Sequence, residues 1–221
     1  THELRTPLTA IIGFAEQLQA QALKPSRNAR YVDIIIDESK RLHRLAEGLI
    51  DVGSWTAGSL RLHPARQSLA SVADSAVQAV AERAASKKVE IRISGDAKAL
   101  VDRDRCLQIF INLLDNAVRY SPESGRVTLS FSERGGLCTA EVKDMGPGFS
   151  AQARSAAGSP FSAGSDGKVG LGLAIARLLV EAHGGSMSLG NGSRGGMVSV
   201  TLPSGNARRQ RIPQGRTDVC E

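Results

Sequence analysis

The sequence predicts an α+β protein in which an antiparallel helical hairpin precedes a mixed β-sheet with helices on one face. Two observations support this fold class. Over residues 4–49 apolar side chains recur at alternating spacings of three and four, which is typical of helices that pack side by side. Beyond residue 64 the pattern changes to short alternating strands interspersed with further helices, which indicates a second, layered domain.

The hairpin is predicted from two apolar series that are separated by a break at residues 24–26. A lone hairpin cannot bury both apolar stripes, whereas four helices from two copies can, so we expect a homodimeric four-helix bundle. Packing of the hairpin on the rest of its own chain is the alternative. The two series are Leu4, Leu8, Ile11, Ala15, Leu18 and Ala22, followed by Val32, Ile35, Ser39, Leu42, Ala46 and Leu49.

Glycine and proline residues then divide the chain. Gly53, Gly58 and Pro64 follow the second helix, and such residues commonly end a helix and begin a linker. We expect a helical domain over 1–57, a linker over 58–63, an α/β domain over 64–203 and a basic, disordered tail over 204–221. In the α/β domain we expect helices at 69–85, 106–120 and 171–183, and strands at 89–94, 126–132, 137–143, 186–189 and 197–202.

Two glycine-containing dipeptides are predicted to close β-hairpins, at Gly135-Gly136 and at Asn191-Gly192. Residues 191–193 also match a glycosylation sequon. The turn is the favoured interpretation, because no secretory signal precedes Thr1.

The amino-acid composition indicates what the core consists of and which cellular compartment suits the protein. Aromatic residues make up only 4% of the 221 residues, so the core is expected to consist of Leu, Ile, Val and Ala. Three widely spaced cysteines, Cys106, Cys138 and Cys220, suggest neither a disulfide framework nor a zinc site, which favours a reducing, cytoplasmic setting. No apolar run approaches the roughly 18 residues of a membrane span. Residues 204–221 carry four arginines against two acidic residues, which we interpret as a solvated end rather than a nucleic-acid or lipid contact.

The helix predicted at 106–120 carries polar residues in a regular arrangement. Asn112 and Asn116 are four residues apart and therefore share one face. Amide oxygens are neutral ligands that suit Mg2+ beside phosphates, so Asn116 is a candidate metal ligand. Arg119 lies one position from that face and is a candidate phosphate contact. The alternative is that these residues are simply the polar side of an amphipathic helix.

Two glycine-rich segments follow. Asp144 leaves a strand and is followed by Gly146 and Gly148, so that the backbone can approach a flat ligand while the carboxylate accepts a hydrogen bond from an exocyclic amine. Gly167, Gly170 and Gly172 lead directly into a helix, whose free N–H groups suit a phosphate. A plain turn and a glycine-rich hinge are the alternatives. Residues 150–166 are rich in Ser, Ala and Gly, which is typical of a mobile lid.

Five motifs stand out in the sequence: THELRTPLTAI, NLLDNAVRYS, DMGPGF, SPFSAG and GLGLAIARLLVEAHGG. Together they resemble the cytoplasmic kinase core of bacterial two-component sensor histidine kinases. They occur in the order and at the separations usual in that family, over residues 1 to about 203, and together they are very specific. The resemblance implies that residues 64–203 form a two-layer α/β sandwich, shared with gyrase and mismatch-repair ATPases, in which ATP lies under a flexible lid.

The resemblance assigns roles to matching positions. His2 corresponds to the phosphoacceptor and Glu3 to the acidic neighbour that orients and activates it, while Thr6 corresponds to a residue that helps to place water for dephosphorylation of the partner regulator. Asn116 corresponds to the Mg2+ ligand, with Asn112 beside it. The other positions implied to contact ATP are Arg119, Tyr120, Asp144, Gly146, Gly148, Phe161, Lys168, Gly170, Leu171 and Gly172.

The sequence departs from the family at Lys168, where a further glycine is usual. A lysine there either adds a phosphate contact or crowds the lid, so nucleotide affinity and lid closure depend on it. Phe161 also lacks the aromatic and basic companions that often accompany it in the family.

The chemistry at the start of the chain fits a nucleophilic histidine. His2 needs a free Nε2 lone pair and a held Nδ1 proton, and a neighbouring carboxylate such as that of Glu3 can hold that proton. Pro7 cannot donate a backbone hydrogen bond to the Glu3 carbonyl, so a bend is expected just after the histidine.

The resemblance implies ATP-dependent autophosphorylation of His2 with Mg2+, and transfer to an aspartate in the receiver domain of a response regulator, which is expected on another chain or in a segment absent from this sequence. We expect a homodimer, no nucleic-acid partner, and membrane contact only through sensor and transmembrane segments upstream of Thr1. The alternatives are a gyrase-like ATPase, which leaves the hairpin and His2 unexplained, and a nucleotide-binding scaffold or phosphatase-biased member with weak kinase activity.

Overall fold

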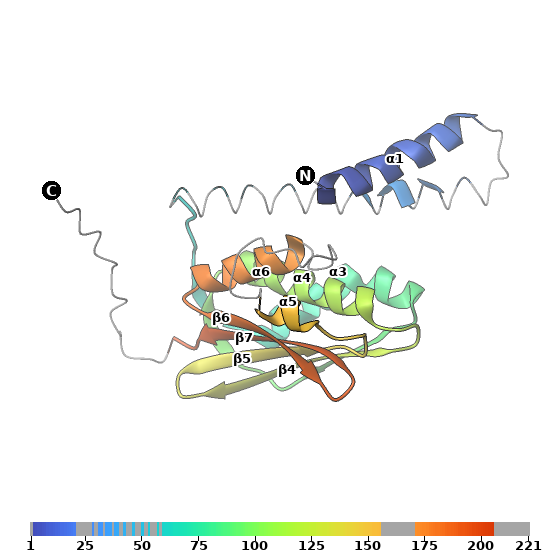
Figure 1. Ribbon diagram of the computed structural model, residues 1–221. Coiled ribbons are helices and arrows are strands. Elements are labelled where there is room, and N and C mark those ends of the chain that lie inside the picture. The colour runs from blue at the N-terminus through green and yellow to red at the C-terminus, as the bar shows by residue number, and fades with distance from the viewer. Residues whose placement is uncertain are drawn as a thin grey trace.

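The computed structural model describes residues 2–20, 59–155 and 171–205, together with individual positions between residues 28 and 57. Helix α1 (His2–Ala20) runs without interruption through Pro7 and lies outside the layers of the α/β domain in Figure 1. The Phe14 and Tyr31 rings lie 5.2 Å apart, which brings the following chain back against α1. The second predicted helix, 32–49, falls largely outside the described residues, although those described between 28 and 53 are all helical.

Five strands form one mixed sheet in the order β2-β4-β5-β7-β6. β2 (Glu90–Ser94) runs parallel to β4 (Arg126–Arg134), and the remaining neighbours are antiparallel. The other strands are β5 (Leu137–Lys143), β6 (Ser186–Gly192) and β7 (Gly195–Pro203). The predicted mixed sheet is therefore confirmed.

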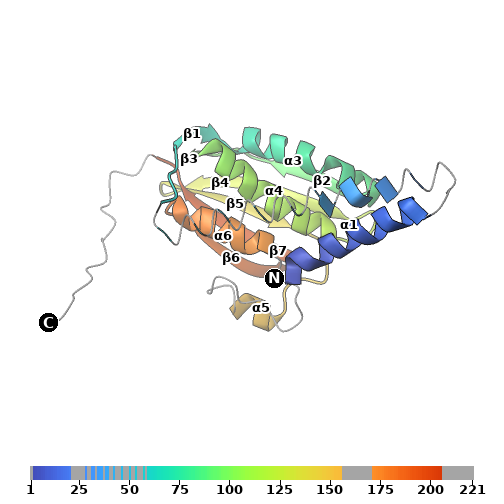
Figure 2. The ribbon, with the colours of Figure 1, turned by 90° about the horizontal axis from the view of Figure 1, so that it is seen from above.

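Three helices cover one face of this sheet and form the second layer (Figures 1 and 2). Viewed from above in Figure 2, α4 (Arg103–Tyr120) lies between α3 (Leu69–Ser86) and α6 (Leu171–Ala182) and contacts both. Helix α4 also lies in the connection between the parallel strands β2 and β4, because a parallel pair requires a long crossover. The predicted two-layer α/β sandwich is confirmed.

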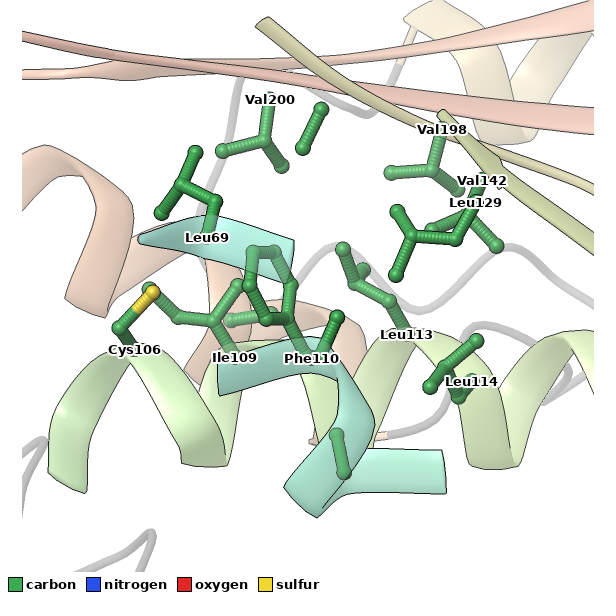
Figure 3. Close-up of a cluster of buried hydrophobic side chains, with 14 of the residues drawn as sticks. Leu69, Cys106, Ile109, Phe110, Leu113, Leu114, Leu129, Val142, Val198 and Val200 are labelled. Carbon is green, nitrogen blue, oxygen red and sulfur yellow. The ribbon is translucent and has the colours of Figure 1, made fainter. Parts of the chain in front are cut away.

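The core lies between α4 and the sheet, as Figure 3 shows. Ile109, Phe110, Leu113 and Leu114 recur at helical spacing and are buried, which stabilises the fold by about 1.5–3 kcal/mol for each side chain. The Phe110 ring is tilted against that of Phe131, 5.7 Å away. The facing sheet residues labelled in Figure 3 are Leu129, Val142, Val198 and Val200.

Cys106 belongs to the same core and has no exposed surface. Burial raises the pKa of its thiol to about 12, and the nearby Asp102 carboxylate adds to this shift. Cys138 is also buried, and burial raises its pKa too. Cys106 and Cys138 are both free thiols inside the protein.

Three short elements were not predicted from the sequence. β1 (Ala65–Ser68) and β3 (Lys98–Val101) form a separate two-stranded antiparallel sheet, and α5 (Ala151–Ser155) follows the loop after β5. Each has only four or five residues, which is too short for a repeating apolar pattern.

Two predicted boundaries need correction. Helix α4 begins at Arg103 rather than Cys106, because the Asp102 carboxylate caps it by accepting hydrogen bonds from the Asp104 and Arg105 N–H groups. The predicted turn at Asn191-Gly192 is wrong, since both residues belong to β6. Gly192 pairs with Gly195, so the two-residue turn consists of Ser193 and Arg194. In the described part of the chain, no helix combines the length and the apolar character needed to cross a membrane.

Candidate functional site

The asparagine face of α4 lies against the start of α6. Asn112 and Asn116 are both half-buried on α4, as their spacing predicted. A Cβ placed on Gly172, in the first turn of α6, would lie 3.5 Å from Oδ1 of Asn112. The structure therefore brings two of the predicted motifs, 60 positions apart, into direct contact.

One polar atom on this face lacks a partner. Nδ2 of Asn112 is buried and makes no hydrogen bond within the described ranges. A buried donor without a partner costs about 1–3 kcal/mol, so native proteins seldom retain one without a role. Beside the N–H groups that the first turn of α6 leaves unbonded, this donor is suited to an anionic ligand.

The carboxyl end of α4 is held by a lysine that the sequence did not single out. Nζ of Lys87, which follows α3, donates to the carbonyls of Val118, Arg119 and Ser121 at 3.2, 2.7 and 2.6 Å. A cation at a helix C-terminus satisfies carbonyls that have no intrahelical partner and complements the helix dipole. Lys87 thereby fixes the last turn of α4, which carries Arg119 and Tyr120.

This last turn meets the loop that follows β5. A Cβ on Gly146 would lie 2.5 Å from the carbonyl oxygen of Tyr120, so a glycine is needed for this close approach. Tyr120 is half-buried, and the exposed Arg119 places its guanidinium carbon 5.9 Å from the centre of the Tyr120 ring. The last turn of α4 therefore lies beside the Asp144 loop.

Asp144 is locked in place by backbone groups. Its Oδ1 accepts hydrogen bonds from the N–H groups of Gly146 at 2.7 Å and of Gly196 at 3.0 Å, and its own N–H donates to the Gly196 carbonyl at 3.0 Å. The hydrogen bonds that described residues make to this carboxylate all fall on Oδ1. The orientation of the half-buried Oδ2 is thus fixed, and this oxygen can accept a hydrogen bond from a ligand.

Glycines of β7 make room for this carboxylate, and sequence analysis missed them. A Cβ on the buried Gly196 would lie 2.6 Å from Oδ2 of Asp144 and 3.0 Å from the Phe149 ring. Gly195 has a φ of +124°, and its Cβ would collide with the Asp144 carbonyl. The sequence does contain one signal for this contact, the Gly-Gly pair at the start of a strand, because glycine in a strand often marks a site where another backbone segment approaches closely.

The loop continues through Gly148 and Phe149 to α5. Gly148 has a φ of +76°, which favours glycine, and a Cβ there would lie 2.8 Å from Oδ1 of Asn191. The Asn191 amide in turn hydrogen-bonds the Phe149 backbone, with Oδ1 accepting from its N–H at 2.7 Å and Nδ2 donating to its carbonyl at 3.0 Å. Asn191 was interpreted from the sequence as a turn residue, so this contact was missed.

Several predicted site residues fall outside what the structure describes. Phe161, Lys168 and Gly170 lie in the stretch 156–170, which is not among the described residues, and Leu171 is described only as the first residue of α6. His2, Glu3 and Thr6 lie in the first turns of α1, and their side chains are likewise outside the described residues.

A second hydrogen-bonded cluster lies at the opposite end of α4 and α6. Oδ2 of Asp102 accepts from the His63 backbone N–H at 2.9 Å, and the Asp102 N–H donates to Nε2 of His183 at 3.0 Å. Partial burial raises the pKa of the Asp102 carboxyl, but hydrogen bonds from the N–H groups of His63, Arg105 and Asp104 outweigh it, so the net shift is downward. This cluster joins the segment before β1 to the helix layer and lies away from Asn112.

Comparison with known proteins agrees with this arrangement. Residues 1–58 match the family described as "His Kinase A (phospho-acceptor) domain", and residues 101–206 match that described as "Histidine kinase-, DNA gyrase B-, and HSP90-like ATPase". The sensor protein SphS of Synechococcus elongatus is 31% identical over 223 residues, which cover 91% of this chain and 52% of SphS. This chain spans 43% and 36% of two further curated relatives.

Solved structures of histidine kinases also resemble this chain. The histidine kinase AdeS of Acinetobacter baumannii superposes with a TM-score of 0.72 at 25% identity, covering 93% of this chain and 99% of that one. Full-length ShkA in complex with AMPPNP superposes with a TM-score of 0.65 at 28% identity, covering 91% of this chain and 44% of that one. The chain belongs to the sensor histidine kinase family of two-component systems and contains its phosphoacceptor and ATPase modules.

Proposed function

We propose that this chain transfers the γ-phosphoryl group of ATP to His2 and then passes it to an aspartate of a response regulator. The observation that carries this proposal is the order of the two family matches, a phosphoacceptor module that includes His2 followed by an ATPase module. The geometry supports it, because the asparagine face of α4, the start of α6 and the Asp144 loop converge at one end of the sandwich.

In this proposal ATP binds between α4 and the Asp144 loop. Oδ2 of Asp144 accepts a hydrogen bond from the adenine amino group, and Tyr120 packs against the adenine ring, while Gly146 and Gly148 let the loop approach it. Nδ2 of Asn112 and the first turn of α6 at Gly172 face the phosphates. The ShkA complex with AMPPNP supports an adenine nucleotide as the ligand.

Mg2+ fits this site through amide and phosphate oxygens rather than through a cluster of carboxylates. Within the described residues, no group of three or more His, Cys, Asp or Glu side chains is arranged to hold a metal ion. We assign Asn116 as its protein ligand, because a neutral amide oxygen adds no repulsion against a triphosphate. When bound, the ion neutralises phosphate charge.

The phosphoryl step uses His2 as the nucleophile. Nε2 attacks the γ-phosphorus in line, a P–N bond forms, the bond to the β-phosphate oxygen breaks, and ADP leaves. Glu3 accepts the Nδ1 proton in a hydrogen bond and stabilises the positive charge that develops on the ring. Helix α1 continues through Pro7, which lacks a backbone donor, and we propose that the helix can bend there and so expose His2.

The remaining assigned positions close the site over the nucleotide. Arg119 is an exposed cation at the end of α4, suited to a phosphate. We assign Phe161, Lys168, Gly170 and Leu171 to the lid and the phosphate-binding turn before α6, with Lys168 as a charged contact where the family usually has glycine.

The helical module is proposed to dimerise. Leu8 and Ile12, one turn apart on α1, are 46% and 49% exposed, and Val32 and Ile36 are both 43% exposed. Apolar side chains at this spacing suit burial against a second copy in a four-helix bundle. Such a bundle presents His2 at its surface to a response regulator, and Thr6 is then placed to orient water for the reverse, phosphatase reaction.

We retain the proposed segments 1–57, 58–63, 64–203 and 204–221 as the helical domain, linker, ATP-binding domain and tail. The kinase core is assigned to the cytoplasm, where ATP and a soluble regulator are both present.

Incubation with Mg2+ and radiolabelled ATP tests this function. We expect a label that is acid-labile and base-stable and that is absent from the His2→Ala variant. The His63→Ala variant is the control and should retain the label, because the His63 side chain is exposed and the residue contributes its backbone N–H to the fold. ATP hydrolysis without label would support the gyrase-like ATPase instead. ATP binding with neither label nor hydrolysis would support the phosphatase-biased scaffold.

A further inference from the structure

The Asn191 side chain makes a paired hydrogen bond with the backbone of a residue 42 positions earlier. Its Oδ1 accepts from the Phe149 N–H at 2.7 Å, and its Nδ2 donates to the Phe149 carbonyl at 3.0 Å. Only an amide offers an acceptor and a donor side by side, so Asn191 pairs with Phe149 as a neighbouring strand would. The two bonds fix both the position and the direction of the Phe149 backbone.

The surrounding backbone is shaped to receive this amide. Gly148 adopts a φ of +76°, and a Cβ there would lie within 2.8 to 3.3 Å of the Oδ1, Cγ and Nδ2 atoms of Asn191. Asn191 itself is held in register by β6, where it pairs with Gly196 of β7. The last hairpin of the sheet thereby supports the loop from outside the proposed ATP site.

Phe149 transmits this support to Asp144. A Cβ on Gly196 would lie 3.0 Å from Cε2 of Phe149 and 2.6 Å from Oδ2 of Asp144, so the ring and the carboxylate flank the same glycine. Phe149 is also partly buried against the core. Moving the Phe149 backbone therefore displaces the group that packs beside the ligand-facing carboxylate oxygen.

The position of Phe149 in the chain gives this contact a second consequence. It is the last loop residue but one before α5 (Ala151–Ser155), and α5 contacts β6, the strand of Asn191. Asn191 thus fixes the chain at the point where the Asp144 loop ends and α5 begins.

We propose that Asn191 is a positioning residue for nucleotide binding, which holds the Gly148–Phe149 backbone so that Asp144 is placed for ATP. The inference rests on the proposed function of this site. Asn191 contacts neither the nucleotide nor the reacting atoms. Its loss is therefore expected to weaken nucleotide binding without abolishing phosphoryl transfer. Both polar atoms of the amide take part in this contact, Oδ1 as acceptor and Nδ2 as donor.

Three variants separate positioning from general stability. Asn191→Ala removes both hydrogen bonds. Asn191→Asp keeps the acceptor for the Phe149 N–H but places a carboxylate oxygen against the Phe149 carbonyl. Ser193→Ala is the matched control, because it changes an exposed residue in the turn of the same hairpin. The measurements are calorimetric titration with ADP, amide hydrogen exchange at Phe149, and the ATP dependence of autophosphorylation.

We expect Asn191→Ala to raise the Kd for ADP about five- to tenfold, in line with the loss of two hydrogen bonds from an exposed loop. The KM for ATP is expected to rise by a similar factor, while the rate at saturating ATP changes less than about twofold. Exchange of the Phe149 amide accelerates in Asn191→Ala and stays slow in Asn191→Asp. Asn191→Asp also weakens ADP binding, and Ser193→Ala matches the parent chain in every measurement.

Unchanged ADP affinity in Asn191→Ala would overturn the inference, and so would an equal loss in Ser193→Ala. A parent chain that binds no ADP would instead refute the proposed function. If Asn191→Ala proves unstable, Asn191→Asp decides the matter, because unchanged ADP affinity in a folded Asn191→Asp protein contradicts a need for the paired bond.

Discussion

The backbone N–H of Asp102 donates a hydrogen bond to Nε2 of His183, 3.0 Å away and 81 residues later in the chain. His183 is only 8% exposed, and its Nδ1 lies 2.7 Å from the Leu179 carbonyl. Nε2 accepts from Asp102, so Nδ1 carries the proton and donates to Leu179. This neutral imidazole connects the carboxyl end of α6 to the first turn of α4.

Replacement of His183 by phenylalanine is expected to lower the free energy of unfolding by about 2 kcal/mol, because it leaves the Asp102 N–H without an acceptor and removes the bond to Leu179. Urea denaturation monitored by circular dichroism measures this change. His63→Ala is the control, since His63 contributes its backbone N–H to the same cluster. Equal stability of His183→Phe and the parent chain would contradict a structural role for this imidazole.

The Asp102 carboxyl is expected to make stability fall in acid. Its pKa in the folded protein is lowered, because hydrogen bonds to the carboxylate outweigh partial burial. A carboxyl group whose pKa is lower in the folded than in the unfolded protein raises the free energy of unfolding at pH values above its unfolded pKa of about 3.9. This stabilisation is lost as the pH falls through the pKa of the folded protein. Asp102→Asn keeps only one of the two acceptor oxygens that receive backbone N–H groups, so it should cost about 1 kcal/mol at pH 7, and the difference should shrink below pH 4. Urea titrations at pH 7, 4 and 3 test this, and a difference independent of pH would contradict it.

Replacement of Gly196 by alanine is expected to weaken nucleotide binding at the proposed ATP site, whereas the same change at a nearby glycine is not. The Cβ of Gly196→Ala would lie 2.6 Å from Oδ2 of Asp144 and 3.0 Å from the Phe149 ring, so both must move. We expect ADP affinity to fall at least about tenfold, the size of losing one charge-assisted hydrogen bond. Gly192→Ala is the matched control, because its nearest neighbouring atom would be 4.0 Å away. Calorimetric titration of both variants decides between selective and general damage.

Loss of the Lys87 ammonium group is expected to loosen the end of α4. Lys87→Met removes three hydrogen bonds to the last carbonyls of that helix and should lower the free energy of unfolding by about 1–3 kcal/mol. Lys88→Met serves as the control, since the Lys88 side chain is 72% exposed and makes only a surface ion pair with Glu123. Thermal unfolding of both variants measures the difference. A smaller effect at Lys87 than at Lys88 would contradict the capping role.

The helices and strands that could be predicted from the sequence are those in which buried apolar side chains recur at a regular spacing. Ile109, Phe110, Leu113 and Leu114 recur on one face of α4, so the helix and its core-facing side follow from spacing alone. The polar face that carries Asn112 and Asn116 follows from the same periodicity. Four-residue strands such as β1 and β3 have no such repeat, because they are specified by their pairing with each other.

The missed parts of the site depend on contacts between distant segments. Asn191-Gly192 has the composition of a tight turn, but the pairing of β6 with β7 places the turn at Ser193 and Arg194. That register is set by burial across the sheet, and it frees the Asn191 amide to reach Phe149. Lys87 was missed for a similar reason, since the carbonyls that it caps lie more than 30 residues away.

The parallel pairing of β2 with β4 has a consequence for how the protein folds. Glu90 pairs with Arg126, and the chain between them includes α4, so these strands cannot align until that helix has formed and crossed over the sheet. Such non-local closure is slow and cooperative. The asparagine face of α4 is therefore completed in the same step that builds the core, and a folded molecule always contains it. The Phe149 loop is joined to this framework by the Asn191 amide and by the Phe149 ring, which packs partly against the core, so its position depends on the paired β6–β7 hairpin that carries Asn191.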